Sequence, residues 1–178
     1  YVKLVTQLFG DRMMIANATG CSSIYGGSAP TCPYTTNEKG FGPAWSNSLF
    51  EDNAEFGFGM NLATTQRRAK LAEVIAEVAE IGKDEAIVAA AKEWLENKDN
   101  AEGSRKAGEK LVAALEAHPE KKGCERREFI LANKDLLTKK SIWIFGGDGW
   151  AYDIGYGGVD HVLAQNQDVN ILVLDTDL

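Results

Sequence analysis

The sequence predicts an α/β protein, a doubly wound parallel sheet that carries a helical insertion. Residues 141–145 and 169–174 are near-continuous apolar runs, as expected for parallel strands covered on both faces. Residues 154–165 lie between these runs and can form a crossover helix, which completes a strand–helix–strand unit. From about residue 49 to residue 137, apolar side chains recur at three- and four-residue spacing, which predicts the helical insertion.

The composition bounds the class of protein and its partners. A chain of 178 residues, 44% of them hydrophobic, is long enough to form one domain with a buried core. Its formal net charge of −7 argues against nucleic acid as the main partner, because phosphate binding requires a basic surface. No apolar run is long enough to span a bilayer, so we expect no membrane partner.

The cysteines and the two ends of the chain indicate its context. Cys21, Cys32 and Cys124 are an odd number at irregular spacing, which argues against a disulfide framework and predicts a cytoplasmic location. The chain opens at Tyr1 within a helix-like pattern and stops at Leu178, directly after a strand pattern. We therefore expect it to be an excerpt of a longer polypeptide.

The first fifty residues combine short elements with polar loops. Residues 2–9 have a helical pattern, and residues 13–16 form a short apolar run that predicts a buried strand. Residues 17–23 are small and polar and predict a loop. The following stretch, as far as Trp45, is rich in Gly, Pro, Ser and Thr and is expected to be irregular.

Two oxygen-bearing side chains follow the predicted strands of the C-terminal part. Asp148 comes just after the first strand and Thr176 just after the second, where ligands of open parallel sheets bind. A carboxylate and a hydroxyl suit Mg²⁺, which takes its remaining ligands from phosphate and water. Gly146, Gly147 and Gly149 remove Cβ atoms where a phosphate approaches, and they permit positive φ angles that point N–H groups at an anion. The pattern predicts a site for magnesium and a diphosphate.

The Gly-Gly-Asp-Gly run has three other interpretations: a tight turn, a dinucleotide-binding fingerprint and a P-loop. Taken alone it is often only a tight turn, but its place directly after a buried strand favours a binding site. A dinucleotide fingerprint would need glycine at position 152, which is Tyr152. A P-loop requires Gly-Lys-Ser/Thr, which does not follow.

Several longer strings resemble one enzyme family. Residues 147–158, which open with the Gly-Asp-Gly of the thiamine-diphosphate motif, resemble pyruvate:ferredoxin (flavodoxin) oxidoreductase, and so do residues 171–176. Residues 1–4, 15–25 and 42–52 match the same family. The resemblance runs from end to end and is weakest in the helical zone.

The resemblance implies a fold and a set of binding residues. It implies that residues 1–178 are a fragment of a thiamine-diphosphate-binding domain, with the helical insertion at about 49–137. It implies that Mg²⁺ is held by Asp148, Thr176 and the backbone carbonyl of Leu178. The residues implied to line the diphosphate are Gly147, Gly149 and Trp150. Cys21 would be one of four thiolates of a 4Fe–4S cluster, whose other ligands lie outside this chain.

The resemblance also implies a reaction and partners. The expected reaction is the oxidative decarboxylation of pyruvate to acetyl-CoA, with electrons passing through iron–sulfur clusters to ferredoxin or flavodoxin. The expected partners are pyruvate, coenzyme A, the electron acceptor, the rest of the parent polypeptide and a second copy in a homodimer. No catalytic residue is assigned to this chain, because the activating glutamate and the pyruvate-binding groups are expected mostly outside it.

Two alternatives stay open at this point. One is a non-catalytic assembly or binding module, and the other is a thiamine-diphosphate enzyme without redox clusters. Cys21, within Ala-Thr-Gly-Cys-Ser-Ser, favours the redox enzyme over the second alternative.

Overall fold

Two compact units make up the chain. The computed structural model describes residues 1–27, 30–118 and 124–176. Unit 1 consists of Tyr1–Ala63 together with Ser141–Leu178, and unit 2 consists of Thr64–Lys140. The long helix α3 (Asn53–Ile81) begins in unit 1 and continues into unit 2.

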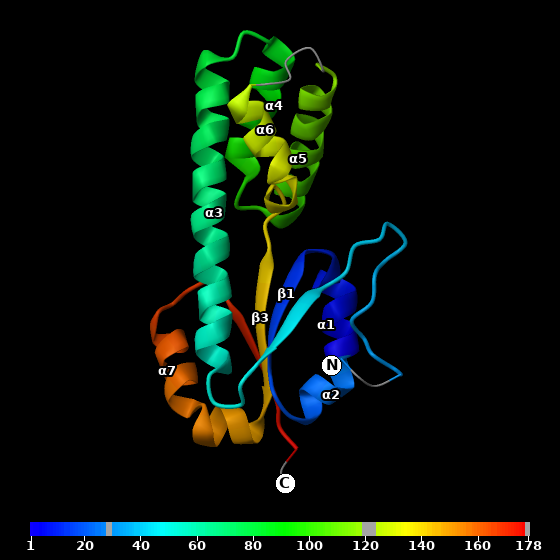
Figure 1. Cartoon of the computed structure of the whole chain (residues 1–178), viewed down its shortest axis with the longest axis vertical. Helices are drawn as coiled ribbons and strands as arrows, with labels where there is room; N and C mark the ends of the chain where they lie inside the picture. The colour runs from blue at the N-terminus through cyan, green and yellow to red at the C-terminus, as the bar shows by residue number, and fades with distance from the viewer. Residues whose placement is uncertain (28–29, 119–123, 177–178) are drawn as a thin grey trace. The chain divides into compact units, whose positions relative to one another are not determined.

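A four-stranded parallel sheet forms the centre of unit 1 (Figure 1). Its strands lie in the order β2-β1-β3-β4, and every neighbouring pair is parallel. Their bounds are β1 (Met13–Ala18), β2 (Ala44–Ser48), β3 (Ser141–Gly147) and β4 (Asn170–Leu174). The predicted α/β class with a parallel sheet is therefore confirmed.

Helices cover both faces of this sheet. Along β1, Met13 and Ile15 pack with Phe145 of β3 against α1 (Val2–Phe9). On the opposite face, Ala18 and Ile144 pack against the first turns of α3 and against α7 (Tyr156–Ala164). Side chains alternate between the two faces of a strand, so a sheet buried on both faces needs continuous apolar runs. Figure 1 shows α7 on one side of the strands and α1 on the other, and the sheet is doubly wound as predicted.

Local differences from the sequence prediction lie in the first fifty residues. Strand β1 extends to Ala18, and a helix, α2 (Cys21–Gly27), begins where a loop was predicted. Strand β2 lies at the end of the stretch predicted to be irregular, at one edge of the sheet. It escaped the prediction because Ser46 and Asn47 are polar and exposed, which breaks the apolar run that identifies a buried strand.

The C-terminal elements follow the predicted order. Strand β3 continues through the two glycines to Gly147, and a short π-helical segment, η4 (Gly149–Ile154), links it to α7. A 3₁₀ turn, η1 (Gly10–Arg12), joins α1 to β1. The predicted strand–helix–strand unit is thus β3, α7 and β4, and it places the carboxyl ends of β3 and β4 side by side.

Unit 2 is helical throughout its ordered elements. After α3 come α4 (Glu85–Asn97), α5 (Ala101–Glu116), α6 (Glu125–Ala132) and the 3₁₀ turn η3 (Lys134–Leu136). The Asp84 carboxylate caps α4 by accepting from two backbone N–H groups, and Asn100 caps α5 in the same way. The fully buried side chains that form its core include Leu71, Ile75, Trp94, Leu111 and Ile130.

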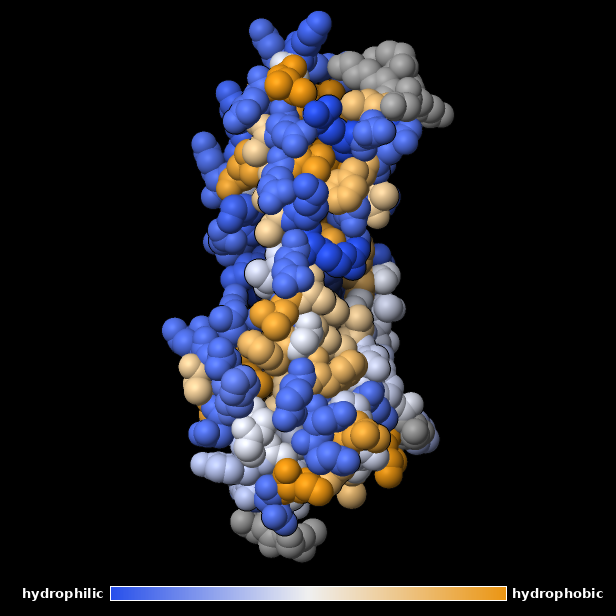
Figure 2. All heavy atoms as spheres, turned by 60° about the vertical axis from the view of Figure 1, so that its left-hand side comes forward, coloured by the Kyte–Doolittle hydropathy of each residue, from blue (hydrophilic) through white to orange (hydrophobic). Residues whose placement is uncertain are grey.

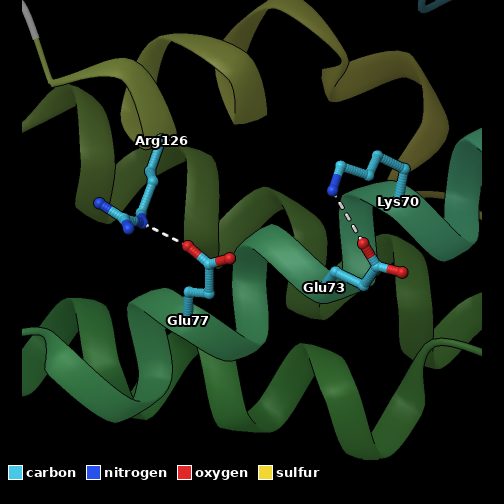
Figure 3. Close-up of polar contacts among 4 residues, drawn as sticks. All are labelled: Lys70, Glu73, Glu77 and Arg126. Carbon is cyan, nitrogen blue, oxygen red and sulfur yellow. Dashed lines mark hydrogen bonds and ion pairs between the residues drawn. The ribbon is translucent and has the colours of Figure 1, made fainter.

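Buried and exposed polar contacts serve unit 2 differently. The indole of Trp94 donates to the carbonyl oxygen of Leu137 over 3.0 Å, and Arg68 donates to the carbonyl oxygens of Leu136 and Lys98. Burial lowers the pKa of Arg68, but an arginine stays charged. Figure 3 shows two surface pairs, Lys70–Glu73 at 2.9 Å and Arg126–Glu77 at 2.6 Å. Such exposed pairs contribute little to stability.

Candidate functional site

The strand order reverses at the centre of the sheet. From β1 the chain crosses to β2 on one side, and from β3 it crosses to β4 on the other side. The two central strands, β1 and β3, therefore border the point where the strand order reverses. Ligands of open parallel sheets bind in the crevice at the carboxyl ends of such strands.

Asp148 and Thr176 meet at this edge of the sheet. The Thr176 hydroxyl donates to Asp148 Oδ1 over 3.2 Å, and the Thr176 backbone N–H points at the same oxygen at 3.4 Å. The residues are 28 positions apart in sequence, but Gly147 and Leu174 are paired in the sheet just before them. Asp148 is half-buried and Thr176 is exposed, so both oxygens can reach a ligand outside the strand ends.

The donor set at this edge fits a hard cation with an incomplete protein shell. A carboxylate and a hydroxyl are oxygen ligands of the kind that Mg²⁺ takes, with water and phosphate completing its octahedron. Within the described ranges, no group of three or more His, Cys, Asp and Glu side chains could hold a metal ion. The residues present thus fit magnesium better than zinc, which needs three or four side-chain ligands. Leu178, the third predicted ligand, lies outside the residues that the structure describes.

The glycines around Asp148 act differently from the prediction. Among the described glycines, positive φ angles occur at Gly20 and Gly40, whereas Gly146 and Gly147 belong to strand β3. Gly146, Gly147 and Gly149 therefore do not use the positive φ angles that glycine permits. A Cβ on Gly147 would have its nearest neighbour, the Leu174 carbonyl oxygen, at 3.8 Å, so packing within this chain does not require glycine there.

The side chain of Trp150 is a core residue. It is fully buried, and a Cβ on Gly146 would lie 2.3 Å from its indole ring. A Cβ on Gly155 would lie equally close, 2.4 Å from the same ring. The two glycines thus make room for the indole, whose Nε1 has no hydrogen-bond partner.

Cys21 lies just after β1, one of the two strands at which the strand order reverses. It is exposed and opens α2, directly after Gly20, whose φ of 147° favours glycine. The turn is held by Ser23, whose hydroxyl accepts from the Gly20 N–H and donates to the Gly20 carbonyl oxygen. Because β1 and β3 are parallel neighbours, Cys21 and Asp148 follow strands that end at the same edge. All three cysteines, including Cys32 and Cys124, are free.

Two buried polar residues near this edge were missed by the sequence analysis. Asn17, in β1, donates to the Ser22 hydroxyl over 2.9 Å and accepts from the Tyr34 hydroxyl over 3.2 Å. Burial, with smaller effects of Cys32 and Tyr25, raises the pKa of Tyr34, so its phenol stays protonated and donates. Asn53 is the second such residue. An asparagine inside the apolar pattern of β1 was the available signal for Asn17.

A separate cavity lies beside α1. It has a volume of about 570 Å³ and is lined by residues of α1, η1 and the segment 30–41, among them Lys3, Asp11 and Phe41. None of Cys21, Asp148 and Thr176 is among the residues that line this cavity. The size of a cavity alone does not mark the chemistry, and we base the candidate site on the strand ends.

Within the described parts of the chain, no helix combines the length and the apolar character needed to cross a bilayer.

Comparison with known proteins shows what the chain is similar to. Residues 67–122, within unit 2, match the family model described as pyruvate-ferredoxin oxidoreductase, insertion domain. Over its whole length the chain is 59% identical to the pyruvate:ferredoxin oxidoreductase of Moorella thermoacetica. It is 53% identical, again over its whole length, to the pyruvate-flavodoxin oxidoreductase of Klebsiella pneumoniae. The chain is thus similar, from end to end, to one segment of pyruvate:ferredoxin and pyruvate-flavodoxin oxidoreductases.

These similarities confirm the resemblance found in the sequence. The similarity extends to a relative whose name gives NADP(+) in place of ferredoxin or flavodoxin. The chain is 51% identical over its whole length to the mitochondrial pyruvate dehydrogenase [NADP(+)] of Euglena gracilis. The chain spans 16% of the Moorella protein, 15% of the Klebsiella protein and 10% of the Euglena protein. It therefore corresponds to one segment of each of these pyruvate oxidoreductases.

Proposed function

We propose that this chain is the thiamine-diphosphate-binding segment of an enzyme that oxidatively decarboxylates pyruvate. The single observation that carries the proposal is the contact between the Thr176 hydroxyl and the Asp148 carboxylate at the strand ends. When bound, thiamine diphosphate supplies the electron sink for loss of CO₂ from a 2-oxoacid. The work of the chain itself is to hold and orient the diphosphate end of this cofactor.

Asp148 and Thr176 would hold Mg²⁺, with the Leu178 carbonyl as the third protein ligand. The charges of unit 1 support a metal-bridged site, since its cationic residues in sequence are Lys3, Arg12 and Lys39. None of these lies in the segments that follow the strands, residues 19–21, 49–52, 148–155 and 175–176. Three of the four segments, residues 49–52, 148–155 and 175–176, carry carboxylates. Carboxylates repel a diphosphate unless a divalent cation lies between them.

Gly147, Gly149 and the backbone of Trp150 would line the diphosphate. Gly149 opens η4, and Asp148 precedes it with helical dihedral angles and no capping hydrogen bond from its side chain. The Asp148 carboxylate is therefore not used by its own helix and is turned to Thr176. The absence of a Cβ at Gly147, where packing does not require it, leaves space for a ligand.

Cys21 would be one thiolate of a 4Fe–4S cluster on the other side of the crevice. Its exposure and its place after β1 support this role, because a cluster ligand must reach an inorganic group outside the chain's own core. Such a cluster needs about four thiolates. Cys32 is half-buried and donates to the Gly26 carbonyl oxygen, and Cys124 belongs to unit 2. The other ligands would come from elsewhere in the parent polypeptide.

The proposed electron acceptor is ferredoxin or flavodoxin, after which the Moorella and Klebsiella relatives are named. The similar segment in a relative named for NADP(+) supports a role shared by all three proteins, upstream of the acceptor. We propose pyruvate and coenzyme A as substrates, the rest of the polypeptide and a second copy as partners, and the cytoplasm as location.

Removal of the Asp148 carboxylate tests this proposal. In the full-length enzyme, Asp148→Asn keeps the shape but loses the negative charge that would bind Mg²⁺. We expect the purified variant to lose most of its bound magnesium and thiamine diphosphate, measured by elemental analysis and by thiochrome fluorescence. Asp153→Asn, at an exposed carboxylate in η4, is the matched control and should retain both. Full cofactor content in the Asp148 variant would contradict the assignment.

The same experiment separates the two alternatives. A non-catalytic module would contain no thiamine diphosphate in the unmutated protein. A thiamine-diphosphate enzyme without redox clusters would contain the cofactor and magnesium but no iron.

A further inference from the structure

A buried asparagine joins the carboxyl ends of the strands that border the crevice. Asn53 is the first residue of α3, and its side chain is fully buried. Its amide nitrogen donates to the carbonyl oxygen of Phe145 in β3 at 2.8 Å and to that of Ala16 in β1 at 3.3 Å. Its amide oxygen accepts from the Ser48 hydroxyl, at the end of β2, over 2.8 Å. One side chain therefore contacts three of the four strands.

These contacts use the chemistry of an amide. Asparagine offers two N–H donors and one acceptor, and all of these are engaged at Asn53. An aspartate of the same shape would present oxygens to the carbonyl groups of Ala16 and Phe145, where donors are required. A leucine would leave the same two carbonyl groups without this donor in a buried place.

The position of Asn53 relates it to both sides of the candidate site. Phe145 lies three residues before Asp148, and Ala16 lies five residues before Cys21. The amide group therefore spans the two central strands just before the turns that carry these residues. On the β1 side, the hydrogen bond from Asn17 to the Ser22 hydroxyl extends the connection into the first turn of α2.

We infer that Asn53 is a positioning residue that sets the separation between the Cys21 turn and the Asp148–Thr176 pair. This inference rests on the proposed function, because the ligands to be positioned are the magnesium diphosphate and the cluster. A site built from two strand ends works best at one separation, because misplacing reacting groups by about 1 Å can lower a reaction rate about 100-fold. We expect a loss of cofactor affinity of similar size when the two strand ends shift.

The test is the substitution Asn53→Asp in the full-length enzyme. We expect the affinity of the cofactor-stripped variant for thiamine diphosphate in the presence of Mg²⁺, measured by titration calorimetry, to fall about 10- to 100-fold. We also expect changed g-values in the EPR spectrum of the reduced enzyme, because the Cys21 turn moves. The matched control is Asn61→Asp, at a buried asparagine about two turns further along α3. The control should lower the melting temperature without changing affinity or spectrum.

If Asn53→Asp does not accumulate as folded enzyme, a milder variant tests whether Asn53 is a positioning residue. Ser48→Ala keeps Asn53 but removes the hydroxyl that orients its amide, and it should weaken cofactor binding in the same direction by a smaller factor. Unchanged affinity in the folded Asn53 variant, or in Ser48→Ala, would overturn the inference, as would an equal loss in Asn61→Asp. The unmutated enzyme is titrated first. If it binds no thiamine diphosphate with Mg²⁺, the proposed function itself has failed.

Discussion

At the scale of single residues, the candidate site depends on atoms that the strand ends bring together. The Asp148 carboxylate and the Thr176 hydroxyl are 3.2 Å apart, although neither position is unusual in its own local sequence. Both residues were predicted from the sequence at the carboxyl ends of two strands, and the structure shows those strands paired. Their role as magnesium ligands stays a prediction, and the Asp148→Asn experiment is its test.

Cys21 is the second single residue whose role can be tested. Replacing this exposed thiol by serine in the full-length enzyme should remove a cluster ligand and leave the fold intact. We expect the iron content to fall, by up to about one cluster for each polypeptide, and the EPR spectrum to lose or alter one signal, with an unchanged melting temperature. Cys124→Ser, at an exposed cysteine of unit 2, is the control and should change neither. Wild-type iron content in the Cys21 variant would remove Cys21 from the cluster.

Residue types alone were less informative where packing decides their role. Trp150 was expected to line the diphosphate, but its indole occupies the core beside Gly146 and Gly155. Sequence patterns cannot separate a glycine that receives a ligand from a glycine that receives a tryptophan, because both roles only require a missing Cβ.

At the scale of elements, the two glycines that end β3 have different neighbours. The Cβ of an alanine at position 146 would lie 2.3 Å from the Trp150 ring, whereas at position 147 the nearest atom would lie at 3.8 Å. Gly146→Ala must therefore displace the end of β3 or the buried indole, and we expect destabilisation of about 1–3 kcal/mol. The measurement is the thermal denaturation midpoint of the full-length enzyme.

Gly147→Ala is the companion variant. We expect it to leave the denaturation midpoint nearly unchanged but to weaken binding of thiamine diphosphate, if the space beside Gly147 receives the diphosphate. Normal stability together with normal affinity would show that this space is not used. Equal destabilisation by the two alanines would contradict the packing argument for Gly146.

At the scale of the whole molecule, each unit has a core of its own. The core of unit 2 is formed by α3, α4, α5, α6 and η3, and the Trp94 and Arg68 hydrogen bonds also lie within this unit. Figure 2 shows mainly hydrophilic side chains on the visible surface of the helical unit, and more apolar and weakly polar ones on unit 1. The chemistry proposed above uses residues of unit 1, and we assign none to unit 2.

A whole-molecule prediction follows from this division. Residues 64–140, produced alone, should form a helical domain that melts cooperatively, because their core and buried hydrogen bonds are internal. Circular dichroism in the far ultraviolet should show helix, and Trp94→Ala should abolish the cooperative transition, at a cost of about 3–5 kcal/mol. A disordered spectrum of the unmutated fragment would show that unit 2 depends on the rest of the chain.

Much of this architecture was predictable from the sequence by itself, because the parallel strands β1, β3 and β4 carry apolar runs and the helices carry periodic ones. The same patterns placed Asp148 and Thr176 at strand ends, since the order of elements determines which residues follow a strand. The tertiary structure alone decided the burial of Trp150, the existence of β2 and α2, and the bridge made by Asn53. The physical reason is the range of the contacts. The hydrogen bond from Asn53 to Phe145 joins residues 92 positions apart, and no local pattern records such a partner.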